Sequence, residues 1–205
     1  MKKASEKSKL ESYIGASPYP LLTEWFKAAR EAEPSYFDAA QLATVDDRGM
    51  PNIRTVLIRS RGQDGFVFYT NLDSKKGREL AAAKKAALLF YWKSLSRQIR
   101  IRGTVTAVSD AQADTYFAGR PLESRIAAHV SLQSSPLSSR AALMKSVELY
   151  ARSFTDKPVP RPSRWSGYCI TPIQIEFWEE GLHRLHDRLL FERKGTSWKR
   201  SLLYP

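Results

Sequence analysis

The sequence contains one cysteine and no long apolar segment, and each of these absences excludes a class of protein. Because Cys169 has no second cysteine to pair with, an internal disulfide is impossible, and the chain suits the reducing cytoplasm. The longest apolar run without a charge covers residues 86–92, much shorter than the roughly 20 residues of a membrane-spanning helix. No apolar segment follows the basic first residues, so no secretory signal is expected. We therefore expect a cytoplasmic protein without a membrane partner.

Acidic residues are scarce relative to basic ones. The chain has 33 Lys and Arg against 21 Asp and Glu, which gives a net charge of +12. Such an excess favours an anionic partner, whether nucleic acid, a membrane surface or a phosphorylated small molecule. The cations are spread along the chain, and the sequence has no zinc-finger spacing, P-loop or aromatic RNA-binding motif. Charge alone therefore indicates an anion, and nucleic-acid binding is the least favoured interpretation.

Short apolar segments separated by turn residues make up most of the 205 residues, a length that fits one domain. Helices are expected at residues 18–31, 74–85, 109–119, 121–130 and 139–154. Strands are expected at residues 39–46, 53–60, 66–70, 86–92, 97–108, 167–171, 173–179, 187–194 and 197–204. Strands around a helical section, without regular strand–helix alternation, predict an α+β fold that is mainly β: an antiparallel β-barrel with peripheral helices. Residues 1–16 are expected to be a flexible segment, and residues 17–205 a single domain.

Two lysines lie where a helix is predicted to begin. Ser74 is the expected N-cap, so Lys75 and Lys76 fall in the first turn, where they oppose the helix dipole. The position is favourable only if the lysines share an anion such as phosphate with the free N–H groups. A solvated lysine pair is the alternative. On the strand at 97–108, Gln98 likewise shares a polar face with two arginines, which indicates either a ligand or an exposed surface.

Residues 116–124 carry a second candidate anion site. Tyr116, Arg120 and Ser124 are four residues apart, so on a continuous helix they would share one face. An arginine with two hydroxyl groups suits a phosphate, although Gly119 and Pro121 make a helix break expected. The alternative is an exposed helix end with polar residues.

The run HRLHDR, residues 183–188, has five ionisable side chains in six positions. In an extended segment Arg184, His186 and Arg188 would project to one side and face a common ligand. A charged turn is the alternative. Only Asp187 is at hand to complete a ligand set with the histidines, so no metal site is expected.

The chain carries an ordered set of motifs from about residue 38 to its end. They are RTVLIR (54–59), GFVFYTN (65–71), SKKGREL (74–80), RQIRI (97–101), YFAGRP (116–121), QSS (133–135), PVPRPSRWSGY (158–168), IEFW (175–178) and HRLHDRL (183–189). In this order the motifs resemble the pyridoxine/pyridoxamine 5′-phosphate oxidase family. The resemblance implies an FMN-binding split β-barrel that forms a homodimer, with both flavin sites at the subunit interface.

The resemblance also implies a role for individual residues. FMN would be bound by Arg54, Thr55, Val56, Leu57, Ile58, Arg59, Tyr69, Thr70, Lys75, Lys76, Gln98, Gln133, Ser134, Trp178 and Arg188. The substrate would be bound by Arg59, Tyr116, Arg120, Ser124, Arg184, Leu185 and His186. Lys75 and Lys76 would hold the FMN phosphate. Arg184 and His186 are the implied catalytic residues, which orient the pyridine ring beside the flavin.

The implied activity is FMN-dependent oxidation of pyridoxine and pyridoxamine 5′-phosphate to pyridoxal 5′-phosphate, with O2 as acceptor and H2O2 as product. The protein would then be a flavoprotein oxidoreductase of vitamin B6 metabolism. Two alternatives are a split-barrel flavoenzyme that oxidises another ring substrate, as phenazine-pathway relatives do, and a non-catalytic flavin- or pyridoxal-phosphate-binding protein.

Four positions depart from the family pattern and motivate these alternatives. The family usually has lysine where Arg59 stands, and an arginine of its N-terminal lid is replaced by Leu10. His129 falls where tryptophan is common, and the chain ends in LLYP without the family's arginine. Arginine and lysine bind phosphate with different geometry, so these changes bear on the substrate more than on FMN.

Overall fold

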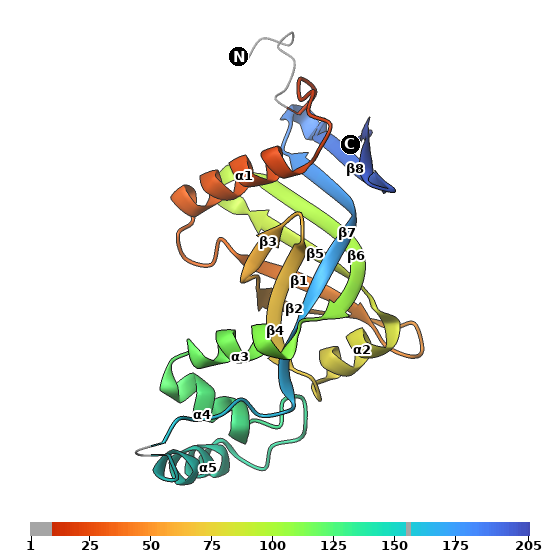
Figure 1. The fold of residues 1–205 in the computed structure, drawn as a ribbon. Coiled ribbons are helices and arrows are strands. Elements are labelled where there is room, and N and C mark those ends of the chain that lie inside the picture. Colours follow the sequence, from red (N-terminus) through yellow and green to blue (C-terminus); the bar gives the residue numbers. More distant parts are fainter. Residues whose placement is uncertain (1–9, 155–156) are drawn as a thin grey trace.

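The computed structural model of the protein describes residues 10–154 and 157–205 (Figure 1). Its strands are β1 (Ala39–Val45), β2 (Pro51–Leu57), β3 (Ser60–Gly62), β4 (Gly65–Asn71), β5 (Lys85–Trp92), β6 (Arg97–Ala107), β7 (Trp165–Glu179), β8 (Asp187–Lys194) and β9 (Ser197–Leu202). Its α-helices are α1 (Tyr19–Ala32), α2 (Lys75–Ala83), α3 (Asp110–Ala118), α4 (Leu122–Val130) and α5 (Arg140–Arg152), with short 3-10 turns at Lys93–Leu95 and Leu182–Arg184. None of the helices in these ranges is long and apolar enough to cross a membrane.

The nine strands form one antiparallel sheet. Its main path is β2-β1-β5-β6-β7-β4-β3, and β8 and β9 extend it from β7. The sheet curls, with α1 across one part of it and α3, α4 and α5 gathered at the opposite end of the molecule (Figure 1). The expected antiparallel α+β architecture with peripheral helices is therefore confirmed.

The long strand β7 is one element where the sequence predicts two, at 167–171 and 173–179. Pro172 has no backbone N–H to donate, but it pairs with Gly103 at the point where the register between β6 and β7 shifts. Glycine is required there, because a side-chain carbon would strike the carbonyl oxygen of Thr171. This irregularity lets the strand continue through the proline, so β7 spans the molecule from the helical end to the β8 end (Figure 1).

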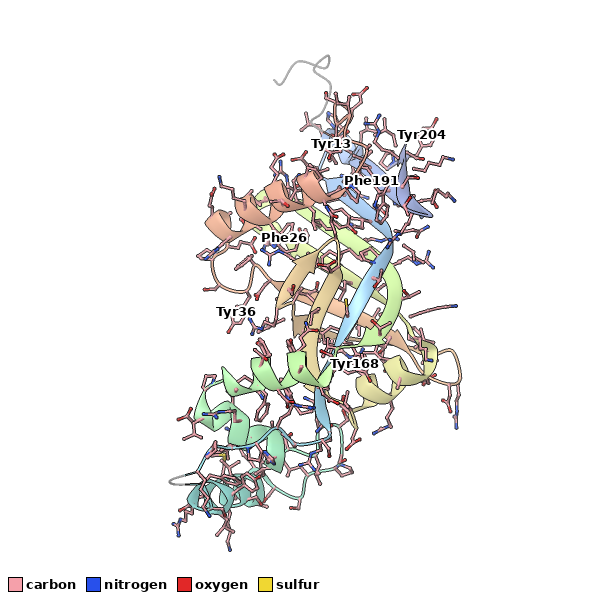
Figure 2. The ribbon with its side chains drawn as sticks, viewed as in Figure 1. Tyr13, Phe26, Tyr36, Tyr168, Phe191 and Tyr204 are labelled. Carbon is pink, nitrogen blue, oxygen red and sulfur yellow. The ribbon has the colours of Figure 1, made fainter. Side chains whose placement is uncertain are left out.

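The core lies between α1 and the sheet, and aromatic residues fill it. Trp25 meets Phe177 edge-on with ring centres 5.2 Å apart, and Phe26, which is labelled in Figure 2, meets Phe90 in the same way at 4.9 Å. From residue 99 to residue 106 of β6, buried apolar positions alternate with exposed polar ones, as the alternation predicts. The rigid sheet formed in this way supports the polar side chains described below.

Two side chains that precede α1, Leu10 and Tyr13, pack against the core, while Ile14 beside them is exposed. Leu10 is only 1% exposed, and the ring of Tyr13 meets that of Phe191 with centres 6.0 Å apart (Figure 2). The first nine residues of the segment predicted to be flexible lie outside the described residues. The division into a flexible segment at 1–16 and a domain at 17–205 therefore stays a prediction.

Candidate active site

The turn between β4 and α2 places two lysines at a helix start. Ser74 caps α2 as predicted, since its hydroxyl accepts the backbone N–H of Gly77 at 3.2 Å. The hydroxyl of Ser134, from the loop after α4, accepts the N–H of Lys75 at 3.1 Å. The helix start thus combines N–H dipoles with two ammonium groups, and this combination is suited to phosphate.

Lys76 extends from this helix start into a pocket. Its ammonium donates to the hydroxyl of Thr70 at 3.2 Å and to the side-chain carbonyl of Gln133 at 2.7 Å. Burial lowers the pKa of Lys76, and the nearby Arg54 lowers this pKa further, while Glu79 opposes the shift. The hydrogen-bond acceptors are neutral oxygens, so they orient the lysine without cancelling its charge.

The pocket around Lys76 has a volume of about 250 Å³. It is lined by Thr55, Val56, Leu57, Arg59, Tyr69, Thr70, Lys76, Tyr116, Arg120, Gln133 and Trp165. The sequence predicts all of these residues except Trp165. An adjoining pocket of about 310 Å³ shares Arg120 and adds Ser124. Residues predicted from β2, from the β4–α2 turn and from the α3–α4 region are therefore brought together.

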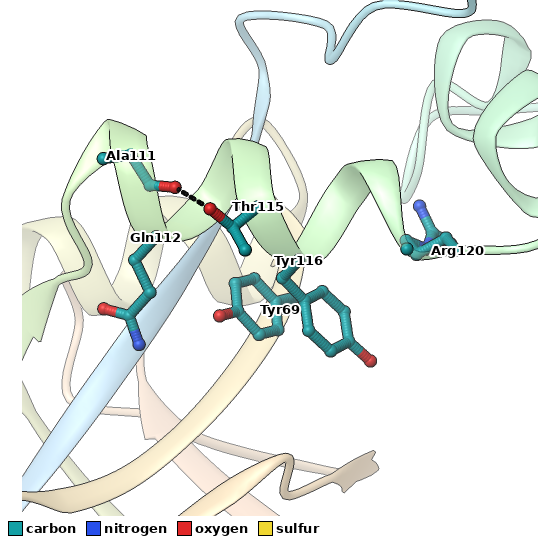
Figure 3. Close-up of a pocket in the computed structure, with 7 residues that line it drawn as sticks. Tyr69, Ala111, Gln112, Thr115, Tyr116 and Arg120 are labelled. Carbon is teal, nitrogen blue, oxygen red and sulfur yellow. Dashed lines mark hydrogen bonds between the residues drawn. The ribbon is translucent and has the colours of Figure 1, made fainter.

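A stacked aromatic group forms one wall of the pocket. The rings of Tyr69 and Tyr116 (Figure 3) are parallel within 3° and 3.9 Å apart. Trp165 stacks on Tyr69 at 5.3 Å. Tyr69 lies over Gly167, where an added side-chain carbon would come within 2.8 Å of its ring. Burial raises the pKa of Tyr69, so this phenol stays neutral at physiological pH. The wall is consequently a fixed, flat and uncharged surface.

A larger recess borders the same aromatic group along α3 (Figure 3). Its volume is about 630 Å³. It is lined by Tyr69, Ala111, Gln112, Thr115, Tyr116, Gly119 and Arg120.

Arg120 stands where these pockets meet, between the end of α3 and the start of α4. Its guanidinium carbon lies 4.8 Å from the ring centre of Trp165, and its Nη1 is buried without a hydrogen-bond partner among the described residues. Burial lowers the pKa of Arg120. The predicted helix break does separate Tyr116 from Ser124, yet all three residues line adjoining pockets. A buried guanidinium nitrogen without an acceptor fits a phosphate oxygen.

The segment at 54–59 contributes less uniformly than the resemblance implies, and the strand expected at 53–60 is interrupted, because β2 ends at Leu57 and β3 begins at Ser60. Ile58 is 1% exposed with its side chain in the core, so only its backbone can face a ligand. Arg59 lines the pocket and also pairs with Asp38 at 3.1 Å. Arg54 donates to the hydroxyl of Thr44 at 2.5 Å, behind the lysines of α2.

A second group of predicted residues lies at the end of β7 that is far from this pocket. Gln98 of β6, Trp178 of β7 and Arg188 of β8 face one another in register across three neighbouring strands. The ring of His186 lies 4.7 Å from that of Trp178. Arg188 donates to the carboxylate of Glu176 at 2.7 Å and to the backbone carbonyl of Tyr204, the residue before the C-terminal one.

The extended conformation expected for HRLHDR is wrong for its first half. Leu182–Arg184 form a 3-10 turn, with φ of 55° at His183 and 65° at Arg184. Because Leu185 donates its N–H to the carbonyl of Leu182 at 3.0 Å, local turn bonds replace strand pairing there. Arg184 and Leu185 are exposed, and β8 begins only at Asp187. The described residues contain no group of three His, Cys, Asp or Glu placed to hold a metal.

The two groups of predicted residues are far apart within one chain. Trp165 begins β7 at the pocket, and Trp178 lies near its other end. Thirteen residues of strand cover roughly 40 Å, at about 3.3 Å a residue. In Figure 1 the helical end and the β8 end of β7 lie at opposite ends of the sheet. Within a single chain, the pocket around Lys76 (the lysine pocket) and the residues around His186 therefore do not form a common site.

Trp165 and Glu79 are candidate residues that the sequence interpretation missed. Trp165 stands in the motif PVPRPSRWSGY, directly between a proline-rich loop and a strand, and that position was an available signal. Glu79 is the only acidic residue of α2 and lies four residues after Lys75, on the buried side of the helix.

Two family models match the chain. The model for pyridoxamine 5′-phosphate oxidase matches residues 26–151. The model for the pyridoxine 5′-phosphate oxidase C-terminal dimerisation region matches residues 165–205.

Similar proteins carry related names. A pyridoxine/pyridoxamine 5′-phosphate oxidase of Brucella canis is 50% identical over 192 residues, which cover 93% of this chain and 95% of that protein. The protein of the same name from Brucella abortus (strain 2308) is also 50% identical, over 93% of this chain and 92% of its own length.

Two solved structures share the fold. PhzG from Burkholderia lata 383, in complex with tetrahydrophenazine-1-carboxylic acid, superposes with a TM-score of 0.89 at 32% identity, covering 98% of both chains. A pyridoxamine 5′-phosphate oxidase-related, FMN binding protein from Nostoc punctiforme has a TM-score of 0.75 at 17% identity, covering 94% of this chain and all of that one.

Proposed function

Because the chain belongs to the pyridoxamine 5′-phosphate oxidase family, whose members are oxidoreductases, we propose that it oxidises pyridoxine 5′-phosphate and pyridoxamine 5′-phosphate to pyridoxal 5′-phosphate. The family implies a flavin, and FMN is the flavin proposed here. When bound, FMN would supply the hydride acceptor for the C4′ carbon of the substrate and a route for two electrons to O2, which would give H2O2; with the amine substrate, water would hydrolyse the resulting imine and release ammonia. The protein contributes binding, orientation and electrostatics.

The FMN phosphate is assigned to the start of α2. Lys75 and Lys76 supply positive charge there, and the helix start supplies N–H dipoles. The residues fit the group because Lys76 is partly desolvated and bonded only to neutral oxygens through Thr70, Ser74 and Gln133. The flat wall of Tyr69 offers an apolar surface beside the same pocket.

The substrate phosphate is assigned to Tyr116, Arg120, Ser124 and Arg59. The observation that carries the proposal is the buried Nη1 of Arg120, which lacks a partner among the described residues and lines the same pocket as Lys76. Two desolvated cations in one pocket repel each other unless anions neutralise them. A phosphorylated cofactor next to a phosphorylated substrate supplies those anions.

The second half of each active site is assigned to another copy of the chain. The chain carries the family's C-terminal dimerisation region, which includes Trp178, Arg184, His186 and Arg188. These residues lie far from the lysine pocket of their own chain, so a homodimer is the arrangement that joins the two groups. Gln98 and Arg188 would then complete the flavin site from across the interface.

Arg184 and His186 are assigned to the substrate ring. Arg184 is exposed on a turn with a positive φ, and His186 is held against Trp178. A cation and an imidazole beside a pyridine ring fix its orientation and stabilise negative charge that develops on it. No covalent role is needed for either residue.

A second candidate function is oxidation of a larger ring substrate. The similarity to PhzG extends over 98% of both chains, and that protein was crystallised with a phenazine carboxylic acid. Arg59 in place of the family's lysine, and the recess of about 630 Å³ along α3, are consistent with a different substrate.

The test is to purify the protein, record its absorbance spectrum and measure peroxide release. We expect a bound flavin with FMN mass, and peroxide with pyridoxine and pyridoxamine 5′-phosphate. Peroxide with a reduced phenazine carboxylate but with neither vitamin B6 phosphate would favour the second function. A protein that takes up no FMN would refute both, and FMN binding without any turnover would leave a non-catalytic flavin protein.

A further inference from the structure

Glu79 is a buried carboxylate next to the proposed phosphate site. Because it is negatively charged, it has no direct role in attracting a phosphate. It lies on α2, one turn after Lys75 and Lys76, and is 6% exposed. Burying a carboxylate costs free energy unless hydrogen bonds and opposite charges compensate. Its partners therefore indicate what the residue is for.

Both carboxylate oxygens of Glu79 are occupied by groups from the neighbouring strands. The hydroxyl of Thr44, on β1, donates to Oε2 at 2.5 Å, and the side-chain amide of Asn52, on β2, donates to Oε1 at 2.6 Å. Arg54, also on β2, lies 3.5 Å from Oε2. The carboxylate thus ties α2 to β1 and to β2, the strand that carries part of the proposed flavin site.

The same network reaches two of the cations assigned to FMN. Arg54 donates to the carbonyl of Leu42 at 3.2 Å and to the Thr44 hydroxyl, which itself donates to Glu79. The side-chain oxygen of Asn52 accepts from the ammonium of Lys75 at 3.3 Å. Glu79 consequently fixes Arg54 directly and Lys75 through one intermediate residue.

The charges of this cluster are consistent with a dianion. Arg54, Lys75 and Lys76 carry three positive charges, and Glu79 carries one negative charge. The remainder matches a phosphate monoester, whose charge is about −1.5 to −2 at pH 7. Burial, followed by repulsion from Arg54, lowers the pKa of Lys76, and Glu79 opposes this effect.

We infer that Glu79 is a positioning residue for the FMN phosphate: it holds Arg54 and, through Asn52, Lys75 in the geometry that receives the phosphate. This inference rests on the proposed function, because it takes FMN as the ligand. Removing Glu79 should therefore change FMN affinity in the direction opposite to that expected from charge attraction alone. Removing a negative charge beside an anion site should strengthen binding, whereas losing the orientation of two cations should weaken it.

The test compares FMN with riboflavin, which lacks the phosphate, in the wild-type protein and in Glu79→Gln. Dissociation constants are measured by flavin fluorescence quenching on flavin-free protein. We expect Glu79→Gln to weaken FMN at least about tenfold and to change riboflavin less than about twofold. FMN binding that is unchanged or tighter in Glu79→Gln would overturn the inference.

Two further variants keep the result interpretable. Asn52→Ala, on the edge strand β2, removes the acceptor of Lys75 together with one donor to Glu79, and leaves Thr44 and Arg54 on the carboxylate. We expect it to weaken FMN by about threefold with riboflavin unchanged; no loss there would remove Lys75 from the inference. Asp73→Asn, just before α2, removes an exposed negative charge outside the network and should not weaken FMN.

Circular dichroism and the melting temperature of each flavin-free variant report folding. Failure of the wild-type protein to bind FMN would refute the proposed function itself, so the two failures are distinct.

Discussion

At the scale of single residues, Lys76 and Arg120 differ from the many surface cations of this chain because burial lowers the pKa of each. Each also lines the same pocket of about 250 Å³. Desolvation makes a cation unfavourable in an empty pocket and favourable once an anion is bound, which is how positive charge becomes selective for a ligand.

Replacing Lys76 with Met should weaken FMN by roughly 10- to 100-fold, because a charge-assisted hydrogen bond contributes about 1.5–3 kcal/mol. Riboflavin binding should change little, since the lost contact is to the phosphate. Fluorescence titration with both flavins measures the effect. Lys27→Met, an exposed lysine of α1, is the matched control. Equal losses for FMN and riboflavin would place Lys76 away from the phosphate.

The lowered pKa of Lys76 also predicts a pH dependence. In the flavin-free protein the lysine loses its proton below the ordinary value of 10.5, so FMN affinity should fall at a lower pH than an ordinary lysine would allow. The dissociation constant is measured between about pH 7 and 10. Lys76→Met should give a flatter profile, and identical profiles for the two proteins would contradict the assignment.

Arg184→Ala should lower kcat/KM for pyridoxine 5′-phosphate by about 100-fold and leave FMN binding within about twofold, because the lost contact is to the substrate ring. Peroxide production and flavin titration measure the two effects. Arg193→Ala, an exposed arginine further along β8, should leave both unchanged. A variant that loses its flavin would show that Arg184 belongs to the cofactor site.

At the scale of elements, much of the arrangement was predictable because local chemistry decides it. Ser74 caps α2 as expected, and Ser109 caps α3 in the same way, since a hydroxyl at the helix start satisfies a free N–H. The alternation of β6 predicts its buried face correctly. The continuity of β7 through Pro172 and the turn at Leu182–Arg184 were not predictable, because a sheet register and a local turn closure override the sequence pattern there.

The position of α3 depends on a contact that the sequence motif only suggests. Arg161, from the proline-rich loop, donates to Asp114 at 2.6 Å and Asp110 at 2.7 Å of α3, and to the carbonyl of Trp165 at 2.9 Å. The hydrogen bond to Asp114 raises the pKa of Arg161, so it stays charged. This arginine therefore ties the helix that carries Tyr116 to the start of β7.

Arg161→Ala should raise the KM for the phosphorylated substrate by about tenfold, because Tyr116 and Arg120 lose their common support. FMN affinity should stay within about threefold. Steady-state kinetics and flavin titration separate the two. Arg152→Ala, which alters an exposed ion pair on α5, is the control and should change neither. An unchanged KM in Arg161→Ala would show that α3 is positioned by other contacts.

At the scale of the whole molecule, the sequence predicts which residues belong to the site but not which chain contributes each of them. The order of the motifs assigns Lys76 and Arg184 to the same site. In the structure of one chain, β7 separates them by most of the length of the sheet. Only the three-dimensional path of that strand reveals the separation. In the proposed dimer, the pocket around Lys76 of one chain therefore works with Arg184 and His186 of the other chain.

Mixed dimers test this claim most directly. Arg120→Ala and Arg184→Ala are co-expressed with different affinity tags, and dimers purified through both tags contain one chain of each kind. If sites are shared between chains, each mixed dimer has one fully wild-type site and one doubly altered site, so peroxide production should recover to about half of the wild-type rate, far above either homodimer. A mixed dimer no more active than the mean of the two altered homodimers would contradict the account.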